Sequence, residues 1–263
     1  MDLATLTLAM VDVAQAAGAE IMQIYTSADF TVDHKADDSP LTAADLASHQ
    51  LIVEALQILT PDYPILSEES AAIDFAVRSQ WPTYWLVDPL DGTREFIKHN
   101  DEFSVLIALI HEHEPVLGVV YAPALQTVWY ASLGNGAYRQ KLQEEPELLN
   151  TREPGDLITV VGSRSHAGDS LNEFLQQFDQ YKLISMGSIL KACLVAEGQA
   201  DFYPRLGLTS EWDTAAAQII VEEAGGLMTD LNGEPLKYNL KESLLNPHFI
   251  VSGNNAYFRD KVS

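Results

Sequence analysis

Residues 85–93, Trp-Leu-Val-Asp-Pro-Leu-Asp-Gly-Thr, constrain the fold of this chain more than any other segment. Residues 84–87 are aromatic or branched and end close to Pro89, which is typical of a buried strand. Pro89 cannot donate to a ladder and an Asp-Gly pair favours a turn, so we expect the strand to break there. Asp88 and Asp91 then stand at the carboxyl end of a strand, where open sheets bind ligands.

An isolated Asp-Gly pair is usually a solvated turn, and an EF-hand is excluded because Leu90 occupies a ligand position. Two further acids change this interpretation. Glu68 follows a short predicted strand at 63–66. Asp213 lies in the first turn of a helix that is predicted to begin at residue 211. Each alone is explained as a first-turn acid stabilised by a helix dipole. Two carboxylates about 4 Å apart, however, repel by roughly 4 kcal/mol at an effective dielectric of 20. Convergence of all four therefore requires hard cations such as Mg²⁺.

The amino-acid composition limits the kinds of molecule that the protein can bind. The 263 residues carry a formal net charge of −23, which argues against nucleic-acid polymers and anionic membranes. A small phosphorylated substrate remains compatible where metal ions and placed basic groups invert the local potential. Cys193 is the single cysteine, which suits a reducing cytoplasm. The N-terminal stretch lacks the basic region of a signal peptide, and the most apolar run, at 103–110, is too short to span a bilayer.

Hydrophobic periodicity predicts a mixed α/β chain in two lobes. Residues 1–150 read as an α+β lobe, in which two helices precede antiparallel strands, and 151–263 read as an α/β lobe of alternating strands and helices. The polar stretch 141–155 is the predicted boundary. The predicted helices of the first lobe cover residues 3–25 and 42–59, and its later strands cover 103–110, 116–121, 128–131 and 137–139.

Three sequence motifs carry a family resemblance: Asp88-Pro-Leu-Asp-Gly-Thr93, Trp212-Asp213-Thr-Ala-Ala downstream, and Glu68-Glu69 upstream. Together they resemble the lithium-sensitive, magnesium-dependent phosphatases of the inositol monophosphatase family. The continuation Arg94-Glu-Phe96 is similar to the branch that hydrolyses adenosine 3′,5′-bisphosphate, the 3′(2′),5′-bisphosphate nucleotidases. The resemblance runs from Lys35 to Pro247.

The resemblance implies the sugar-phosphatase fold, layered α-β-α-β-α. It implies hydrolysis of adenosine 3′,5′-bisphosphate to AMP and phosphate, which recycles a by-product of sulfate assimilation. Two Mg²⁺ ions are implied, and a third is left open. Inositol monophosphate or a sugar bisphosphate is the alternative substrate, and a non-catalytic cation- or nucleotide-binding module is the alternative class. Peripheral attachment to the cytoplasmic face of the inner membrane is implied by relatives alone, and the sequence leaves the oligomeric state open.

The metal and catalytic residues follow from the resemblance position by position. One Mg²⁺ would be held by Glu68, Asp88 and the Leu90 carbonyl, and the other by Asp88, Asp91 and Asp213. Thr93 would take a proton from the attacking water and relay it to Asp45. The spacing also makes Asp45 the third residue of a capping box begun by Thr42, and the two roles are compatible. Glu69 and Lys35 would stand near the third metal.

The substrate contacts are also implied by the resemblance. Glu68, Asp91, Gly92, Thr93 and Asp213 would surround the phosphate that is cleaved. The predicted nucleotide contacts are Ser165, His166, Gly187, Ser188 and Lys191. Gly187 and Ser188 precede a predicted helix, where backbone N–H groups can meet an anion, and Lys191 would add charge opposite the phosphate that stays in place.

Overall fold

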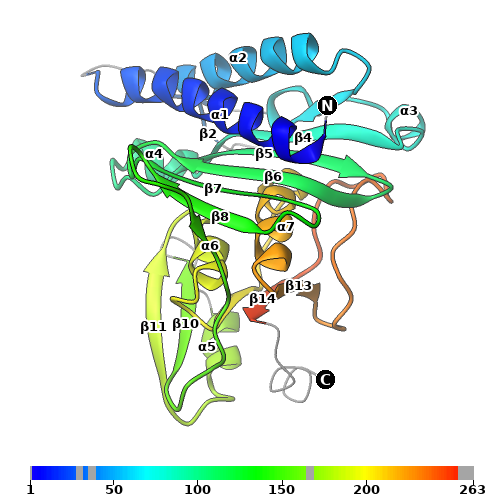
Figure 1. Ribbon diagram of the computed structural model, residues 1–263. Helices are drawn as coiled ribbons and strands as arrows, with labels where there is room; N and C mark the ends of the chain where they lie inside the picture. Colours follow the sequence, from blue (N-terminus) through cyan, green and yellow to red (C-terminus); the bar gives the residue numbers. More distant parts are fainter. Residues whose placement is uncertain (1, 28–31, 35–39, 164–168, 254–263) are drawn as a thin grey trace.

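A computed structural model describes residues 2–27, 32–34, 40–163 and 169–253. The described part of the chain forms five layers, helix–sheet–helix–sheet–helix, which confirms the predicted fold (Figure 1). Helices α1 (Leu3–Tyr25) and α2 (Ala43–Leu59) form the first outer layer. Helices α6 (Leu190–Ala196) and α7 (Ala215–Glu223) lie between the two sheets, and α5 (Asp169–Leu175) covers the far face of the second sheet.

The first sheet has the strand order β3-β4-β5-β6-β7-β8-β9, in which β3 and β4 are parallel and every other pair is antiparallel. Its faces alternate with the period of two that strands impose. Trp85 and Val87 pack with α1 and α2, whereas Tyr84 and Leu86 face the middle helices. The strands are β3 (Ile65–Ser67), β4 (Thr83–Asp91), β5 (Ser104–His111), β6 (Glu114–Ala122), β7 (Thr127–Ser132), β8 (Ala137–Lys141) and β9 (Glu147–Leu148).

The second sheet has the order β11-β10-β12-β14-β13. Val160 belongs to the cluster beneath α5, and its neighbour Val161 belongs to the cluster around α6 and α7, so both faces of this sheet are covered. Strand β14 is absent from the sequence prediction although it lies between β12 and β13. The strands are β10 (Ile158–Ser163), β11 (Tyr181–Met186), β12 (Phe202–Arg205), β13 (Gly226–Asp230) and β14 (Phe249–Gly253).

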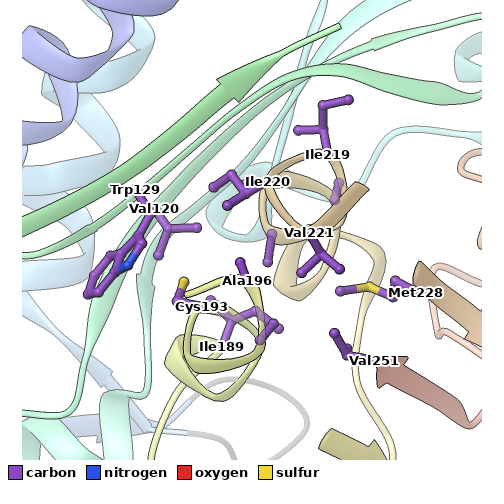
Figure 2. Packing of buried hydrophobic residues seen from close by; sticks show 14 of the residues in the cluster. Val120, Trp129, Ile189, Cys193, Ala196, Ile219, Ile220, Val221, Met228 and Val251 are labelled. Atoms are coloured by element: carbon purple, nitrogen blue, oxygen red, sulfur yellow. The ribbon is translucent and has the colours of Figure 1, made fainter. Parts of the chain in front are cut away.

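The middle helices share one core with both sheets (Figure 2). Ile220 of α7 and Cys193 of α6 lie in the same cluster as Val120 of the first sheet and Val251 of the second. Helix α7 approaches β6 so closely that a Cβ at Gly118 would lie 2.2 Å from the Ala216 carbonyl oxygen, so only glycine fits there. The division of the chain at residue 150 stays a prediction.

Helix starts agree with the sequence chemistry. The Asp2 carboxylate accepts the Thr5 N–H at 3.0 Å and caps α1, and Thr42 and Asp45 form the predicted capping box of α2. None of the described helices is long and apolar enough to cross a membrane. The remaining elements are short: β1 (Val32–His34), β2 (Pro40–Thr42), α3 (Phe75–Arg78), α4 (Thr93–Ile97), and the 3₁₀ turns η1 (Glu68–Ser70) and η2 (Glu211–Asp213).

Candidate metal centre

Strand β4 delivers two of the acidic side chains. It runs through Pro89 as far as Asp91, so the prediction that the strand breaks at Pro89 is wrong. Its pairing with β5 shifts register between Asp88 and Asp91, and such a bulge tolerates the missing proline N–H. The Asp-Gly pair likewise joins the strand to α4 rather than forming a hairpin, with Gly92 at φ 91°.

Three carboxylates converge at the end of β4. Asp88, Asp91 and Asp213 each offer an oxygen, and these oxygens all lie within 4.8 Å of one another. Asp213 comes from η2, more than 120 residues further along the chain, so two separate parts of the fold build the cluster. The three acids line a cavity of about 590 Å³ with Glu68, Leu90, Gly92 and Thr93, all of which are predicted site residues.

The electrostatics of this cluster favour a cation. Burial raises the pKa of Asp88 well above its ordinary value, and the charges of Glu68, Asp91 and Asp213 raise it further. Burial and the same neighbouring acids raise the pKa of Asp213 well above its ordinary value too. Such oxygens are the donors that Mg²⁺ prefers, and a divalent cation removes the repulsion that these shifts express. The donor set therefore fits a hard metal ion.

Glu68 and Leu90, which are predicted to hold the first metal ion with Asp88, line the same cavity as Asp88. Glu68 begins η1 directly after β3, and its charge raises the pKa values of Asp88 and Asp213. The Leu90 N–H donates to Asp88 Oδ1 at 3.0 Å, which fixes that carboxylate against the bulge. The role of Glu68 and of the Leu90 carbonyl as ligands stays a prediction, and so does a third site at Glu69.

Thr93 lies between the predicted base and the metal cluster. Its hydroxyl is 3.4 Å from Asp45 Oδ1 and 3.3 Å from the Leu90 carbonyl oxygen. The other Asp45 oxygen accepts the Thr42 N–H at 2.7 Å. One carboxylate thus caps α2 with Oδ2 and faces the threonine with Oδ1, so the geometry accommodates both roles predicted for Asp45.

The loop before α6 contacts two carboxylates, those of Asp91 and Glu102, at the end of β4 and just before β5. The Gly187 N–H donates to Glu102 Oε2 at 2.7 Å, and the Ile189 N–H donates to Asp91 Oδ2 at 2.6 Å. The Ser188 hydroxyl also donates to Asp91. The anions at these donors are the chain's own carboxylates. Direct contacts of Gly187 and Ser188 with a substrate stay predictions.

Lys191 lines the cavity but is only 4% exposed. Its ammonium donates to the Met186 and Ser188 carbonyl oxygens and lies 5.1 Å from the centre of the Tyr203 ring. Burial lowers the pKa of Lys191 to about 8, a shift that the Asp91 charge opposes. The lysine is therefore a buried cation whose charge changes close to neutral pH.

One residue near the site falls outside the sequence prediction, and three predicted residues fall outside the described residues. Glu102 is not predicted, because nothing in its local sequence shows that it meets residue 187. Arg205 lines the same cavity as Lys191, and its place after Tyr203-Pro204 is a weak indication of the site in the sequence. Ser165, His166 and Lys35 lie outside the described residues.

The comparisons with known proteins agree with this site. The sequence profile described as the inositol monophosphatase family matches residues 2–258. The chain therefore belongs to the inositol monophosphatase family. It is similar to the 3′(2′),5′-bisphosphate nucleotidase CysQ of Salmonella typhimurium, with 50% identity over 91% of this chain and 96% of the relative. The CysQ protein of Haemophilus influenzae is 39% identical over 93% of this chain and 91% of the relative.

Solved structures give the same family. The crystal structure of CysQ from Bacteroides thetaiotaomicron has a TM-score of 0.84 and 42% identity, covering 95% of this chain and 98% of that one. The Thermotoga maritima inositol monophosphatase has a TM-score of 0.78 and 27% identity, covering 96% and 93%. The identity to each of the three CysQ proteins is thus higher than to this inositol monophosphatase.

Proposed function

We propose that the protein is a Mg²⁺-dependent 3′(2′),5′-bisphosphate nucleotidase that hydrolyses adenosine 3′,5′-bisphosphate to AMP and phosphate. The observation that carries this proposal is the convergence of Asp88, Asp91 and Asp213 at one cavity that Lys191 and Arg205 also line. The carboxylates suit metal ions and a phosphate to be cleaved, and the two cations suit a second phosphate. The high identity to CysQ relatives supports the same substrate.

The chain's own residues supply the metal-binding and proton-transfer groups. Asp88, Asp91 and Asp213 would hold one Mg²⁺, and Glu68, Asp88 and the Leu90 carbonyl would hold another. Bound there, the ions supply charge neutralisation for the phosphate and lower the pKa of a water. Thr93 Oγ1 accepts the water's proton while it donates its own to Asp45 Oδ1, the resulting hydroxide attacks the 3′-phosphorus, the bond from phosphorus to the 3′-oxygen breaks, and that oxygen of AMP takes up a proton from solvent.

The proposal includes the setting in which the enzyme works. By-product removal in sulfate assimilation places it in the cytoplasm, and the buried thiol of Cys193 suits that compartment. Its partner is a small phosphate ester. A third Mg²⁺ and peripheral membrane attachment are left as predictions of the resemblance, and no oligomeric state is proposed.

A substrate panel tests the proposed function. Phosphate release from adenosine 3′,5′-bisphosphate, 3′-AMP and inositol 1-phosphate is measured with Mg²⁺ and with a chelator. We expect the highest kcat/KM for the bisphosphate and no release in the chelator. A preference for inositol 1-phosphate replaces the proposal by an inositol monophosphatase. Metal binding without phosphate release from any ester would instead indicate a binding module.

The preference for the bisphosphate should depend on pH through Lys191. Its pKa of about 8 means that the ammonium is charged below pH 8 and neutral above it. We expect the ratio of kcat/KM for adenosine 3′,5′-bisphosphate over 3′-AMP to fall roughly five- to tenfold between pH 7 and pH 9, because the charged fraction of Lys191 falls about tenfold over this range and a charge-assisted contact is lost with it. The quantity kcat/KM reports the free enzyme, so this pKa is the relevant one.

The matched variants separate Lys191 from other effects of pH. Lys191→Met should show a low ratio at every pH, whereas Lys182→Met, at an exposed position of β11, should behave as wild type. A ratio that falls with pH equally in Lys191→Met would show that another group recognises the second phosphate.

A further inference from the structure

A polar cluster lies next to η2, among residues that do not line the cavity. It consists of the buried residues Arg78, Tyr84, Glu211 and Asn239 with the exposed Lys241 at its edge, and it is called here the Arg78–Glu211 cluster. Arg78 is 2% exposed and Glu211 is 1% exposed. Neither residue belongs to the cavity lining, so the proposed reaction does not use them directly.

The turn that carries Asp213 is too short to fix its own position in the fold. Turn η2 has three residues, and a helical turn of that length has almost no stability of its own. Asp213 Oδ2 accepts the Ser210 N–H at 2.8 Å, which fixes the carboxylate relative to the turn but not relative to β4. Asp88 and Asp91 stand on β4, a strand of the seven-stranded sheet, whereas η2 belongs to neither sheet. The distance between the two halves of the triad therefore depends on what anchors η2.

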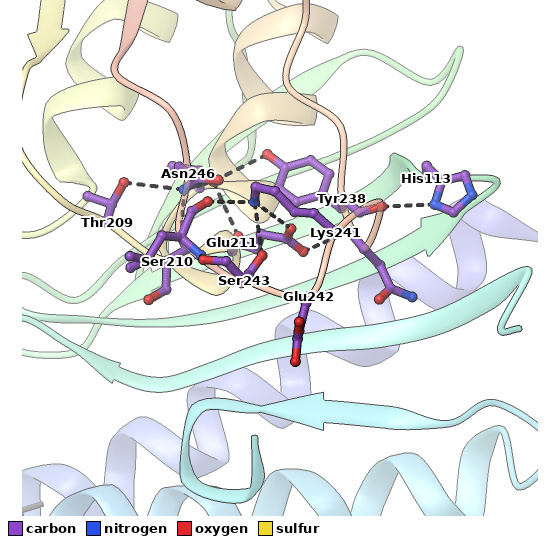
Figure 3. Close-up of polar contacts among 12 residues, drawn as sticks. His113, Thr209, Ser210, Glu211, Tyr238, Lys241, Glu242, Ser243 and Asn246 are labelled. Atoms are coloured by element: carbon purple, nitrogen blue, oxygen red, sulfur yellow. Dashed lines mark hydrogen bonds and ion pairs between the residues drawn. The ribbon is translucent and has the colours of Figure 1, made fainter. Parts of the chain in front are cut away.

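Segment 239–246 supplies that anchor. Glu211 Oε2 accepts the Asn239 N–H at 2.8 Å, and Oε1 lies 3.5 Å from the Lys241 ammonium. The Glu211 N–H donates to the Leu244 carbonyl oxygen at 2.8 Å. The Asn246 amide donates to the Ser210 carbonyl oxygen at 2.6 Å. Main-chain and side-chain groups of η2 are thus both held by this segment (Figure 3).

Arg78 ties the same segment to the first lobe. Its guanidinium donates to Asn239 Oδ1 and to the carbonyl oxygens of Lys241 and Glu242. In return the Asn239 amide donates to the Arg78 carbonyl oxygen at 2.6 Å. Arg78 ends α3, which directly precedes β4 in the chain. A continuous path of hydrogen bonds therefore joins the element before Asp88 to the turn that carries Asp213.

The Arg78–Glu211 cluster lowers the stability of the fold, which a purely structural feature would not be expected to do. Within this cluster, Arg78 Nε and Tyr84 Oη are buried without a hydrogen-bond partner among the described residues, and Glu211 Oε1 has only the Lys241 ammonium at 3.5 Å. Burial of such atoms lowers stability, and a hydrophobic core of the same shape would avoid this loss. Unsatisfied buried groups in a native protein call for a reason beyond stability. Placement of Asp213 opposite the two acids of β4 is such a reason.

We infer that Glu211 is a positioning residue for the metal ligand Asp213, and that Asn239 and Arg78 connect it to the lobe that carries Asp88 and Asp91. The inference rests on the proposed function, because it takes the acidic triad as the Mg²⁺ site. Loss of groups that orient a ligand typically lowers metal affinity 10- to 100-fold.

The test is the Mg²⁺ affinity of folded variants, measured by titration calorimetry without substrate and well below each melting temperature. We expect Glu211→Gln, which keeps an acceptor for the Asn239 N–H, to weaken Mg²⁺ binding about tenfold, and Glu211→Ala about a hundredfold. Asp201→Asn is the matched control. Asp201 is 2% exposed, accepts a backbone N–H and forms an ion pair with an arginine, and it does not line the cavity. It should lower the melting temperature and leave Mg²⁺ affinity unchanged.

A second variant keeps the inference testable if Glu211→Ala fails to fold. Asn239 has φ 59°, a conformation that glycine adopts readily, so Asn239→Gly keeps the N–H that Glu211 accepts and removes only the link to Arg78. It should also weaken Mg²⁺ binding. Variants that bind Mg²⁺ as tightly as wild type, with melting temperatures lowered as in Asp201→Asn, overturn the inference alone. A wild type that binds no Mg²⁺ overturns the proposed function together with it.

Discussion

Asp91→Asn is expected to abolish phosphate release while the protein remains folded. The change removes one negative donor from the three that converge within 4.8 Å, and a bound metal contributes several kcal/mol to transition-state stabilisation. A loss of about 4 kcal/mol corresponds to roughly a 10³-fold fall in kcat/KM. The asparagine carbonyl can still accept the Ile189 N–H that Asp91 accepts, so the loop before α6 keeps an anchor.

The same substitution should stabilise the metal-free protein. Burial raises the pKa of Asp91 above 3.8, so the folded state binds protons more readily than the unfolded state. The wild type without metal therefore loses stability as pH rises from about 4 through the raised pKa values. Asp91→Asn avoids that loss, and we expect its metal-free melting temperature to exceed wild type at pH 7, by about 2–4 °C for each 1 kcal/mol regained. The difference should vanish below pH 4.

Thermal melts with and without Mg²⁺, recorded beside activity, check both expectations. Mg²⁺ should raise the melting temperature of wild type and leave Asp91→Asn almost unchanged. Asp12→Asn, which removes an exposed charge on α1, controls for the change in net charge. Near-normal phosphate release by Asp91→Asn would refute the metal assignment.

Local chemistry explains why the helices and most strands could be predicted. Apolar residues at helical spacing gave both ends of α1, and the Thr42–Asp45 capping box gave the start of α2. The faces of β4 alternate as period two requires. Each of these signals lies within one element, so it is visible in the sequence before the chain folds.

The errors arose where the outcome depends on a partner strand. Pro89 reads as a strand terminator, yet β5 continues alongside β4 because a bulge absorbs the proline. Strand β14 is five residues long and pairs with β12 and β13, which end 44 and 19 residues before it begins. The local sequence around residue 249 contains no signal that this segment pairs with two strands that lie earlier in the chain.

The same distinction applies to the site. The motif around Asp88 and the residues at Asp213 carry their own chemistry in sequence, and the structure brings these acids together. The contacts of Glu102 with residue 187 and of Arg78 with Asn239 join segments 85 and 161 residues apart. Only the packing of one layer on another creates them, so local sequence patterns could not reveal them.

Removal of the Thr93 hydroxyl should have the second largest effect. Thr93→Val keeps the shape of the side chain and removes the group that lies between Asp45 Oδ1 and the Leu90 carbonyl. We expect kcat to fall about 10²–10⁴-fold, the usual contribution of a positioned proton-transfer group. Mg²⁺ affinity should change little, because the three carboxylates supply most of it. Thr127→Val is the control, since the Thr127 hydroxyl also donates to a nearby carbonyl oxygen, that of Leu125, and Thr127 begins β7 outside the residues that line the cavity.

The pairing of Thr93 with Asp45 is decided by a double-mutant cycle that keeps the helix cap. Asp45→Asn retains an oxygen that can accept the Thr42 N–H, so α2 keeps its capping bond, but the amide cannot take a proton from Thr93. If the two residues move one proton together, Asp45→Asn alone should cost nearly as much in kcat as Thr93→Val, and the double variant hardly more than either. Thr93→Ser should restore most of the rate. Full activity of Asp45→Asn, together with a loss of about 1 kcal/mol of stability in Asp45→Ala, would leave Asp45 as a helix cap only.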